Sequence, residues 1–344
     1  MSNFLNIKKP PRKILVIKPS SLGDVVHSLP FLNVMRECFP RAEIHWVIAK
    51  GLEGLLENHP MVQKLLVINK DQWKEIKRIR GTVSEFRSLM CALKGESYDI
   101  AVDLQGLLRS GILTAASKAP VRLGFSEARE GSRLFYTQRI TGGREIHAVD
   151  RYLKIASALG CDTRTVEFPL PLVTESLKIR RLKQEIGEYA VFAPGARWKT
   201  KQWPAERFGR LSSMLSMPSI IIGSGADDAL AQEAAAHSKG KAISLAGKTD
   251  IKELISIVRK AVFMVTNDSG PMHIAAACGV PVVALFGPTN PARTGPYGRG
   301  HIVIRGDSAC APCYKKKCKD IRCMDSISVD EVYEAIRNGM GAKL

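Results

Sequence analysis

Short apolar runs alternate with helix-like segments along almost the whole chain, and this alternation restricts the possible fold more than any other feature. Strands that alternate with helices form parallel sheets covered by helices on both faces. The strands that the pattern predicts are residues 13–18, 44–49, 65–68, 100–104, 121–125, 189–193, 219–222, 242–245, 263–265 and 280–286. We therefore predict an α/β protein with doubly wound parallel sheets.

The alternation occurs twice, with an irregular stretch at residues 163–185 between the halves. A chain of 344 residues is long enough for two hydrophobic cores of about 150 residues each. We predict two Rossmann-like domains, residues 1–170 and 188–327, joined by a linker at 171–187. The last helix, within residues 328–344, is expected to pack back on the first domain.

The formal net charge of +18 indicates an anionic partner, either a phosphorylated ligand or an anionic membrane surface. Nucleic acid is not favoured, because no helix-turn-helix or zinc-finger pattern is visible and only 6% of residues are aromatic. The polar N-terminus and the absence of a long apolar stretch predict a cytoplasmic protein. Lys74, Lys77 and Arg78 on a predicted helix at residues 72–94 are candidates for contact with acidic headgroups, although a solvated helix face is the default explanation for such a run.

Residues 262–298 have the features of an anion-binding site. An apolar strand ends in Asp268, and Ser269 and Gly270 lead into a helix of small residues that carries His273. The start of such a helix presents unpaired backbone N–H groups and the positive end of the helix dipole to a phosphate. The alternative is a simple helix cap, since Asp and Ser are common there. We favour a phosphate or diphosphate site.

A similar strand-to-helix junction follows residues 13–18, where Ser21 and Asp24 fit a capping box. The functional alternative is a carboxylate at the C-terminal edge of the first strand, the position of a general base. This loop lacks the G-x-G-x-x-G spacing of dinucleotide-binding turns, so it does not indicate a nicotinamide enzyme.

Four of the eight cysteines are clustered as C-x2-C-x4-C-x4-C, at Cys310, Cys313, Cys318 and Cys323. The pattern is compatible with structural zinc, with an iron–sulfur cluster or with a disulfide, the last being disfavoured in a cytosolic protein. Cys38, Cys91, Cys161 and Cys278 stand singly and are expected to be reduced, small buried side chains.

Six segments occur in a characteristic order: LVIKPSSLGDVVHSLP, DLQGLLRS, HAVDR, PGARWKTKQWP, NDSGPMHIAAA and FGPTNPARTGPYG. Together they resemble the motifs of glycosyltransferase family 9, the ADP-heptose:lipopolysaccharide heptosyltransferases. The resemblance implies a GT-B fold, in which two Rossmann-like domains face a central crevice. It also implies inverting, metal-independent transfer of heptose from ADP-heptose to Kdo on lipid A, at the inner face of the inner membrane and with no cofactor.

The resemblance also implies roles for individual residues. Asp24 matches the general base and Lys201 the lysine that binds the donor phosphate, and the absence of an Asp-x-Asp motif leaves Lys201 and the helix start at Ser269 to neutralise the departing ADP. The expected donor-binding residues are Lys201, Asp227 or Asp228 at a ribose position, Asp268, Ser269, Gly270 and His273. The expected acceptor-binding residues are Ser21, Gly23, Gln105, Arg129 and His147.

Three alternatives remain at this point. The first motif resembles heptosyltransferase I, whereas PGARWKTKQWP and NDSGPMH resemble heptosyltransferase II, whose acceptor is the heptosylated core. A sugar-nucleotide epimerase can have the same two domains and would turn over the donor without an acceptor. A non-catalytic nucleotide- or membrane-binding module would account for the charge but would leave Asp24 without a role.

Overall fold

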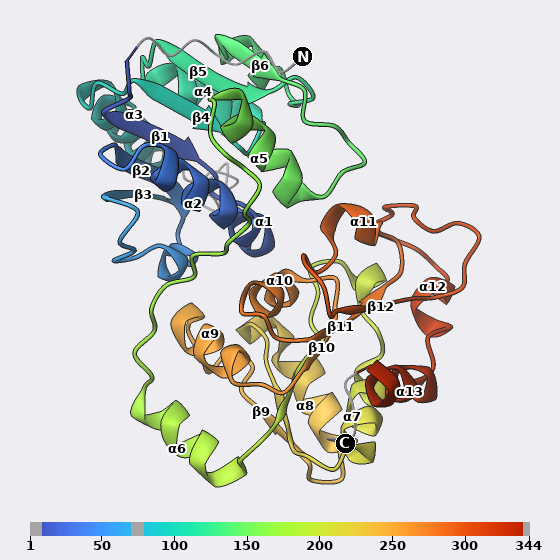
Figure 1. Cartoon of the computed structure of the whole chain (residues 1–344). Helices are drawn as coiled ribbons and strands as arrows, with labels where there is room; N and C mark the ends of the chain where they lie inside the picture. Colours follow the sequence, from blue (N-terminus) through green and yellow to red (C-terminus); the bar gives the residue numbers. More distant parts are fainter. Residues whose placement is uncertain (1–8, 70–78, 340–344) are drawn as a thin grey trace. The chain divides into compact units, whose positions relative to one another are not determined.

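The structure is a computed structural model that describes residues 9–69 and 79–339, with side chains omitted for residues 79–86. It divides into two compact units, Met1–Pro171 and Leu172–Leu344. Each unit contains one six-stranded sheet in which every pairing is parallel (Figure 1). The predicted doubly wound α/β architecture is therefore present twice.

In the first unit the strand order is β3-β2-β1-β4-β5-β6. Its strands are β1 (Lys13–Ile17), β2 (Glu43–Ala49), β3 (Lys64–Ile68), β4 (Ile100–Asp103), β5 (Val121–Phe125) and β6 (Gln138–Ile140), and its helices are α1 (Leu22–His27), α2 (Leu29–Cys38), α3 (Ile79–Gly95), α4 (Leu108–Ala116) and α5 (Ala148–Ala158). Helices α1, α2 and α5 pack together on one face, and α3 and α4 cover the other. The apolar residues of β1 are fully buried because both faces of the sheet are covered.

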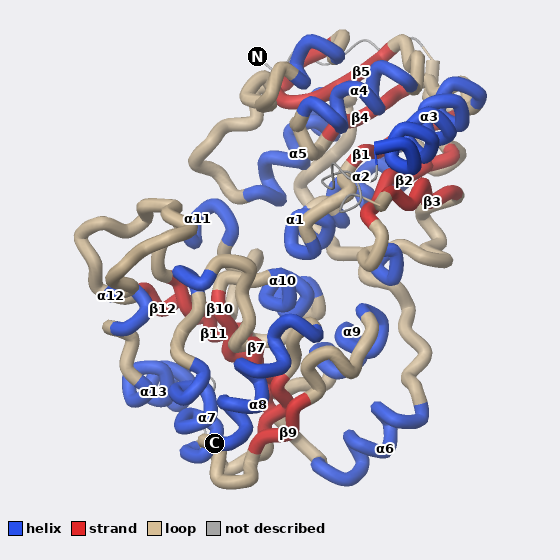
Figure 2. The backbone as a smooth tube through the Cα atoms, turned by 180° about the vertical axis from the view of Figure 1, so that it is seen from behind, coloured by secondary structure: helices blue, strands red, loops and turns tan. Residues whose placement is uncertain are grey.

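In the second unit the order is β12-β11-β10-β7-β8-β9. Its strands are β7 (Ala190–Ala193), β8 (Ser219–Ile221), β9 (Ala242–Ser244), β10 (Met264–Asn267), β11 (Val282–Phe286) and β12 (Ile302–Arg305), and its helices are α6 (Leu177–Ile186), α7 (Ala205–Met214), α8 (Asp228–Ala236), α9 (Ile251–Arg259), α10 (Gly270–Ala277), α11 (Pro291–Thr294), α12 (Arg322–Asp325) and α13 (Val329–Gly339). Helices α7, α8 and α13 share one core, whereas α9 packs on α6 and α10 (Figure 2).

The C-terminal helix does not follow the prediction. Helix α13 packs on α7, β11 and β12, and its Val332 and Ile336 are fully buried in the core of the second unit. The apolar face that was expected to cover the first domain is thus already buried within its own unit. The predicted linker is also structured: α6 lies within residues 171–187, and Ser176 binds Glu253 on α9 through a 2.7 Å hydrogen bond.

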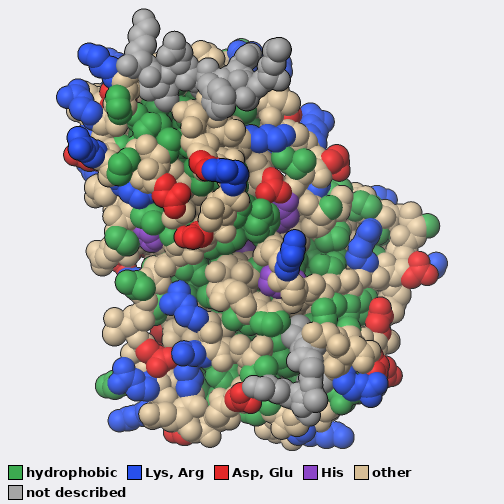
Figure 3. Space-filling model, viewed as in Figure 1, with side chains coloured by type: hydrophobic (Ala, Val, Ile, Leu, Met, Phe, Trp, Pro, Cys, Tyr) green, Lys and Arg blue, Asp and Glu red, His purple; other side chains and the backbone are tan. Residues whose placement is uncertain are grey.

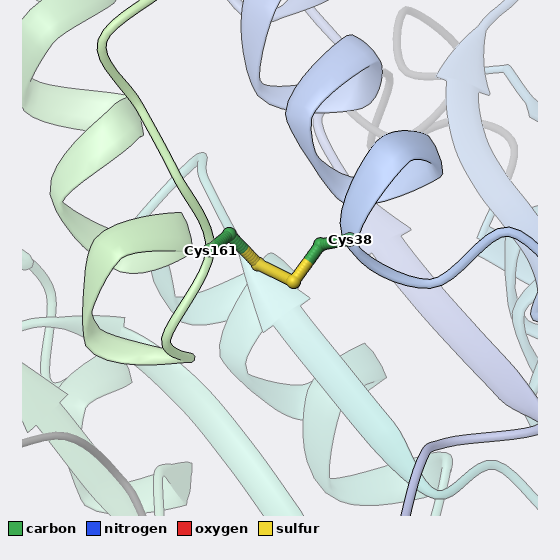
Figure 4. Close-up of a disulfide and its surroundings, with 2 residues drawn as sticks. All are labelled: Cys38 and Cys161. Carbon is green, nitrogen blue, oxygen red and sulfur yellow. A yellow bond between two sulfur atoms is a disulfide. The ribbon is translucent and has the colours of Figure 1, made fainter.

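Cys38 and Cys161 form a disulfide, contrary to the expectation that both are reduced (Figure 4). Cys38 ends α2 and Cys161 follows α5, and these two helices pack against each other. The Cα atoms are therefore 5.5 Å apart although 123 residues separate the cysteines in sequence. Disulfides are uncommon in the reducing cytoplasm. The disulfide between Cys38 and Cys161 is therefore unusual for the cytoplasmic location that the sequence predicts.

Two edge strands, β6 and β12, were not predicted. Strand β6 (QRI) is largely exposed and has a single apolar residue, and β12 (IVIR) has an apolar run of only three residues. Lys74, Lys77 and Arg78 lie outside the described residues, so the predicted headgroup-binding face is not tested. None of the helices in the described ranges is long and apolar enough to span a membrane. On the face shown in Figure 3, Lys and Arg side chains are scattered over both units and do not gather in one stripe.

Candidate active site

The predicted site residues lie where the strand order of each sheet reverses direction. In the first unit the reversal falls between β1 and β4, and in the second between β7 and β10. At such a point the two outgoing loops diverge to opposite faces, which opens a crevice at the carboxyl ends of the strands. Helix α1 with Asp24 follows β1, and the loop with Gln105 follows β4; the loops that carry Lys201 and Asp268 follow β7 and β10. Each unit thus has one candidate half-site.

In the second unit Lys201 and Asp268 form the centre of the half-site. The Nζ atom of Lys201 lies 2.6 Å from Oδ2 of Asp268, and the hydroxyl of Thr289, beyond β11, donates to the same oxygen at 2.6 Å. Three strand-end loops therefore converge on one carboxylate that is only 7% exposed. Asn267, the last residue of β10, fixes the loop after β7, because its amide donates to the Pro194 carbonyl at 2.7 Å and its Oδ1 accepts from the backbone N–H of Trp203 at 3.1 Å.

The start of helix α10 has no side-chain cap in the described part of the chain. Ser269 occupies the N-cap position, but its side chain makes no capping hydrogen bond within the described chain, and its hydroxyl lies 3.2 Å from that of Thr266. The carboxylate of Asp268 binds Lys201 and Thr289. The side chains of Asp268 and Ser269 therefore do not act as a simple cap of α10. The first backbone N–H groups of α10 keep their capacity to bind an anion.

Asp227 and Asp228 differ in their surroundings. Asp227 accepts from the backbone N–H and hydroxyl of Ser224 at 2.9 and 2.7 Å, and it packs so closely on Gly195 that a Cβ atom there would meet its Oδ1 at 2.4 Å. It lies between the loops after β7 and β8. Asp228 is exposed on α8 beside Gln232. Of the two, Asp227 is the carboxylate next to the crevice. His273 is buried within α10.

In the first unit Asp24 is both a helix-capping residue and an accessible carboxylate beyond the end of β1. Its Oδ2 accepts hydrogen bonds from the backbone N–H and the hydroxyl of Ser21, at 2.9 and 2.7 Å, so the capping interaction exists. Its Oδ1 lies 3.8 Å from the Nζ atom of Lys18, and the side chain is 42% exposed. A carboxylate with one oxygen fixed and accessible surface remaining can accept a proton from a bound substrate. Gly23 is buried in α1 beside it.

Sequence reasoning missed Lys18. This lysine directly follows β1, is 2% exposed, donates to the Leu104 carbonyl at 3.4 Å and has its ammonium 5.1 Å from the ring centroid of Tyr152. Burial lowers the pKa of Lys18, but the Asp24 carboxylate and then Tyr152 raise it, so that the pKa lies above its ordinary value. Lys18 therefore stays cationic beside Asp24. The sequence signal that could have identified Lys18 is its position as a lysine directly after a buried apolar strand.

Gln105 and Arg129 are brought together by backbone contacts. The N–H of Arg129 donates to the Gly106 carbonyl at 2.9 Å, and the N–H of Gln105 donates to Asp103 Oδ1 at 2.8 Å. Burial raises the pKa of Asp103, whose Oδ2 accepts from Tyr136 at 2.6 Å. The Oε1 atom of Gln105 is buried and accepts no hydrogen bond within the described chain. A ligand at this edge could supply that donor.

His147 is also close to α1. It is the N-cap of α5, where its Nδ1 accepts from the Val149 N–H at 3.2 Å, and its ring makes an edge contact with His27 at a centroid distance of 5.0 Å. His27 belongs to the same short helix as Asp24. The predicted acceptor residues of the first unit therefore gather around α1 and the β4 loop.

The clustered cysteines do not form a metal site. No three His, Cys, Asp or Glu side chains of the described chain lie close enough together to hold a metal ion. Cys310 lies 3.2 Å from the Ser308 hydroxyl, and the Cys318 thiol donates to the Asp320 carbonyl at 3.0 Å. Burial, followed by the Coulombic effect of the other three cysteines, raises the pKa of Cys323. The predicted structural zinc site is therefore not assembled, because the exposed thiols point to local oxygen partners.

Comparison with known proteins identifies the family. Residues 86–322 match glycosyltransferase family 9 (heptosyltransferase). The chain belongs to this family. It is 33% identical over 324 residues to lipopolysaccharide heptosyltransferase 1 of Pseudomonas aeruginosa. This alignment covers 89% of the present chain and 87% of that protein. The predicted resemblance is confirmed, and the family 9 chain is a glycosyltransferase.

Solved structures agree with this assignment. The family 9 glycosyltransferase of Veillonella parvula superimposes with a TM-score of 0.82 at 27% identity, over 96% of this chain and 97% of that one. Escherichia coli heptosyltransferase WaaC with ADP gives a TM-score of 0.77 at 24% identity, over 95% and 99% of the two chains. These matches along the full length of both chains confirm the predicted GT-B fold.

Proposed function

We propose that this family 9 enzyme transfers heptose from ADP-heptose to Kdo on lipid A, with inversion at the anomeric carbon. The observation that carries the proposal is the convergence of Lys201, Asp268 and the uncapped start of α10 at the switch point of one sheet. Relatives named heptosyltransferase 1, from several bacteria, support the choice of acceptor.

In the proposed reaction Asp24 accepts the proton of the acceptor hydroxyl. The acceptor oxygen forms a bond to the anomeric carbon while the bond from that carbon to the phosphate oxygen breaks, and the electron pair leaves with ADP. Lys201 and the backbone N–H groups of Ser269 and Gly270 stabilise the negative charge on ADP. Asp227 binds the ribose, and Asp268 and His273 complete the donor site.

We assign the acceptor to the first unit, where Ser21, Gly23, Gln105, Arg129 and His147 surround Asp24 or the β4 loop. The partly buried Gln105 and the exposed guanidinium of Arg129 suit an acidic sugar, because Arg binds carboxylates with two parallel hydrogen bonds. With a net charge of +18, the enzyme is proposed to work at the anionic inner face of the inner membrane.

Heptosyltransferase 2 activity is the second candidate, because relatives with that name are 27% identical to the chain. The test is incubation with ADP-heptose and either Kdo-lipid A or heptosylated core, with ADP release and product mass as readouts. We expect one added heptose on Kdo-lipid A only. Product on heptosylated core alone would assign type 2. Donor isomerisation without acceptor would indicate an epimerase, and no turnover with either acceptor would leave a binding module.

A further inference from the structure

The central cation of the donor half-site is already engaged by a carboxylate. The ammonium of Lys201 is 17% exposed and is already paired at 2.6 Å with the Asp268 carboxylate. A nucleoside diphosphate brings two to three negative charges, which the start of one helix neutralises only partly, with about half an elementary charge. A further cation near Lys201 would therefore contribute to donor binding.

A segment far away in the sequence docks on the same loops. The segment at residues 314–317, which we call the lysine loop, lies between Cys313 and Cys318. The hydroxyl of Thr200 donates to the Lys315 carbonyl at 2.8 Å, and the Tyr314 N–H donates to the Pro288 carbonyl at 2.8 Å. Thr200 adjoins Lys201, and Pro288 adjoins the Thr289 that binds Asp268. The lysine loop is thus attached to two loops of the donor half-site.

Within the lysine loop, Lys316 shares an aromatic neighbour with Lys201. The Nζ atom of Lys316 is 5.4 Å from the ring centroid of Trp198, and the Nζ atom of Lys201 is 4.6 Å from the same centroid. One indole therefore positions both ammonium groups by cation–π contact. Lys316 is exposed, and it forms no ion pair with any acidic side chain in the described ranges, so its charge is available to a ligand.

We propose that Lys316 is a second phosphate-binding cation of the donor site, held by Trp198 and acting together with Lys201 on the diphosphate of the sugar nucleotide. This inference rests on the proposed function, since it assumes that the diphosphate binds at Lys201 and α10. It gives the lysine loop a role that neither the motifs nor a metal at the cysteines accounts for. It also supplies charge from a segment more than a hundred residues from Lys201 in sequence.

The test is calorimetric titration of ADP into the full-length enzyme and its variants at low ionic strength. Lys316→Gln should weaken ADP binding by about two- to fivefold, the range for an exposed charge interaction. The matched control is Lys317→Gln, which removes the same charge from the neighbouring exposed residue and should leave the affinity unchanged. Lys316→Arg should retain most of the affinity. High salt should remove the difference between Lys316→Gln and the wild type.

A double-mutant cycle tests the role of the indole. In a Trp198→Leu background, Lys316→Gln should have a smaller effect, because the ammonium is no longer held over the ring. Equal ADP affinities for Lys316→Gln and Lys317→Gln, with weakened binding in Lys201→Ala, would refute the role of Lys316 and leave the donor site in place. If Lys201→Ala also bound ADP like the wild type, the proposed donor site itself would be wrong.

Discussion

At the scale of single residues, Asp24 is constrained on both of its oxygens. One oxygen is fixed by Ser21, and the other lies 3.8 Å from the buried ammonium of Lys18. An opposite charge at this distance favours the ionised carboxylate, the form that a general base requires. The hydrogen bonds that cap α1 therefore also orient the proposed base.

Asp24→Asn should reduce heptose transfer by about 100-fold or more, because an amide cannot take up the acceptor proton. ADP affinity should stay within a few fold of wild type, since the proposed nucleotide site lies in the second unit. The assay is turnover with ADP-heptose and Kdo-lipid A beside an ADP titration. Ser21→Ala is the control for capping: it should lower the melting temperature while keeping measurable turnover. Wild-type turnover in Asp24→Asn would reduce Asp24 to a helix cap.

Lys201→Ala should weaken ADP binding by about one to two orders of magnitude, as expected for loss of a charge-assisted contact of roughly 1.5 to 3 kcal/mol. The substitution also leaves the Asp268 carboxylate at the proposed phosphate site without its cationic partner. Lys199→Ala, which removes an exposed lysine from the same turn, is the matched control and should bind ADP normally.

Gly270→Val should also impair ADP binding, because a branched side chain at the start of α10 blocks close approach of the phosphate to the backbone. Calorimetric titrations are compared with melting curves for each variant. Loss of stability with intact ADP affinity would mean that this residue only shapes the helix. Unchanged ADP affinity in both Gly270→Val and Lys201→Ala would move the donor site elsewhere.

At the scale of secondary-structure elements, Glu96 connects three of them at the end of the first sheet opposite the site. It follows α3 and binds Lys13 at the start of β1 and Lys64 at the start of β3, at 2.7 and 2.5 Å. The hydrogen bond from Lys13, followed by that from Lys64, lowers the pKa of Glu96 from 4.5 to about 2. The folded protein therefore holds this carboxylate ionised more strongly than the unfolded chain does.

A lowered carboxyl pKa stabilises the folded state fully above the unfolded pKa, near 4.5, and this stabilisation is lost as the pH falls towards about 2. Glu96→Gln should therefore lower the free energy of unfolding at pH 7 by about 1 to 2 kcal/mol, with allowance for the exposed Lys64. The difference from wild type should shrink at about pH 3. Denaturant unfolding at both pH values measures it.

The control is Glu206→Gln, which removes a surface pair with Arg210 in which both side chains are more than half exposed. Such pairs contribute about 0 to 1 kcal/mol, so little change is expected at either pH. If Glu96→Gln were as stable as Glu206→Gln at neutral pH, the three-way ion pair would not hold these elements together.

At the scale of the whole molecule, the net charge of +18 should draw the enzyme to anionic membranes. Sedimentation with vesicles that contain anionic lipid should show binding that weakens as salt concentration rises. Charge reversal at Lys74, Lys77 and Arg78 should weaken it further, since each basic group near such a surface contributes about 1 kcal/mol. The control reverses three exposed lysines elsewhere, Lys118, Lys239 and Lys260. Equal losses in both triple variants would point to net charge alone, and binding independent of salt would exclude the electrostatic mechanism.

The sequence determined the parts of this protein that depend on local order along the chain. The ten predicted strands, the strand-to-helix junctions at Asp24 and Ser269 and the ordered motifs all depend on residues close together in the chain. Buried parallel strands read as continuous apolar runs, so both sheets were predictable. Edge strands β6 and β12 were missed because their apolar runs are too short, with one apolar residue in β6 and three in β12.

Only the tertiary structure decided which distant residues meet. Lys18 contacts the Leu104 carbonyl, 86 residues away in sequence. Lys316 lies against Trp198, 118 residues away, and the disulfide joins Cys38 to Cys161, 123 residues away. The same holds for α13, whose apolar face fits either unit by pattern but is buried in the second. Hydrophobic periodicity predicts which face of a helix or strand is buried. The element against which that face packs depends on the strand order of the sheet and on where the loops diverge.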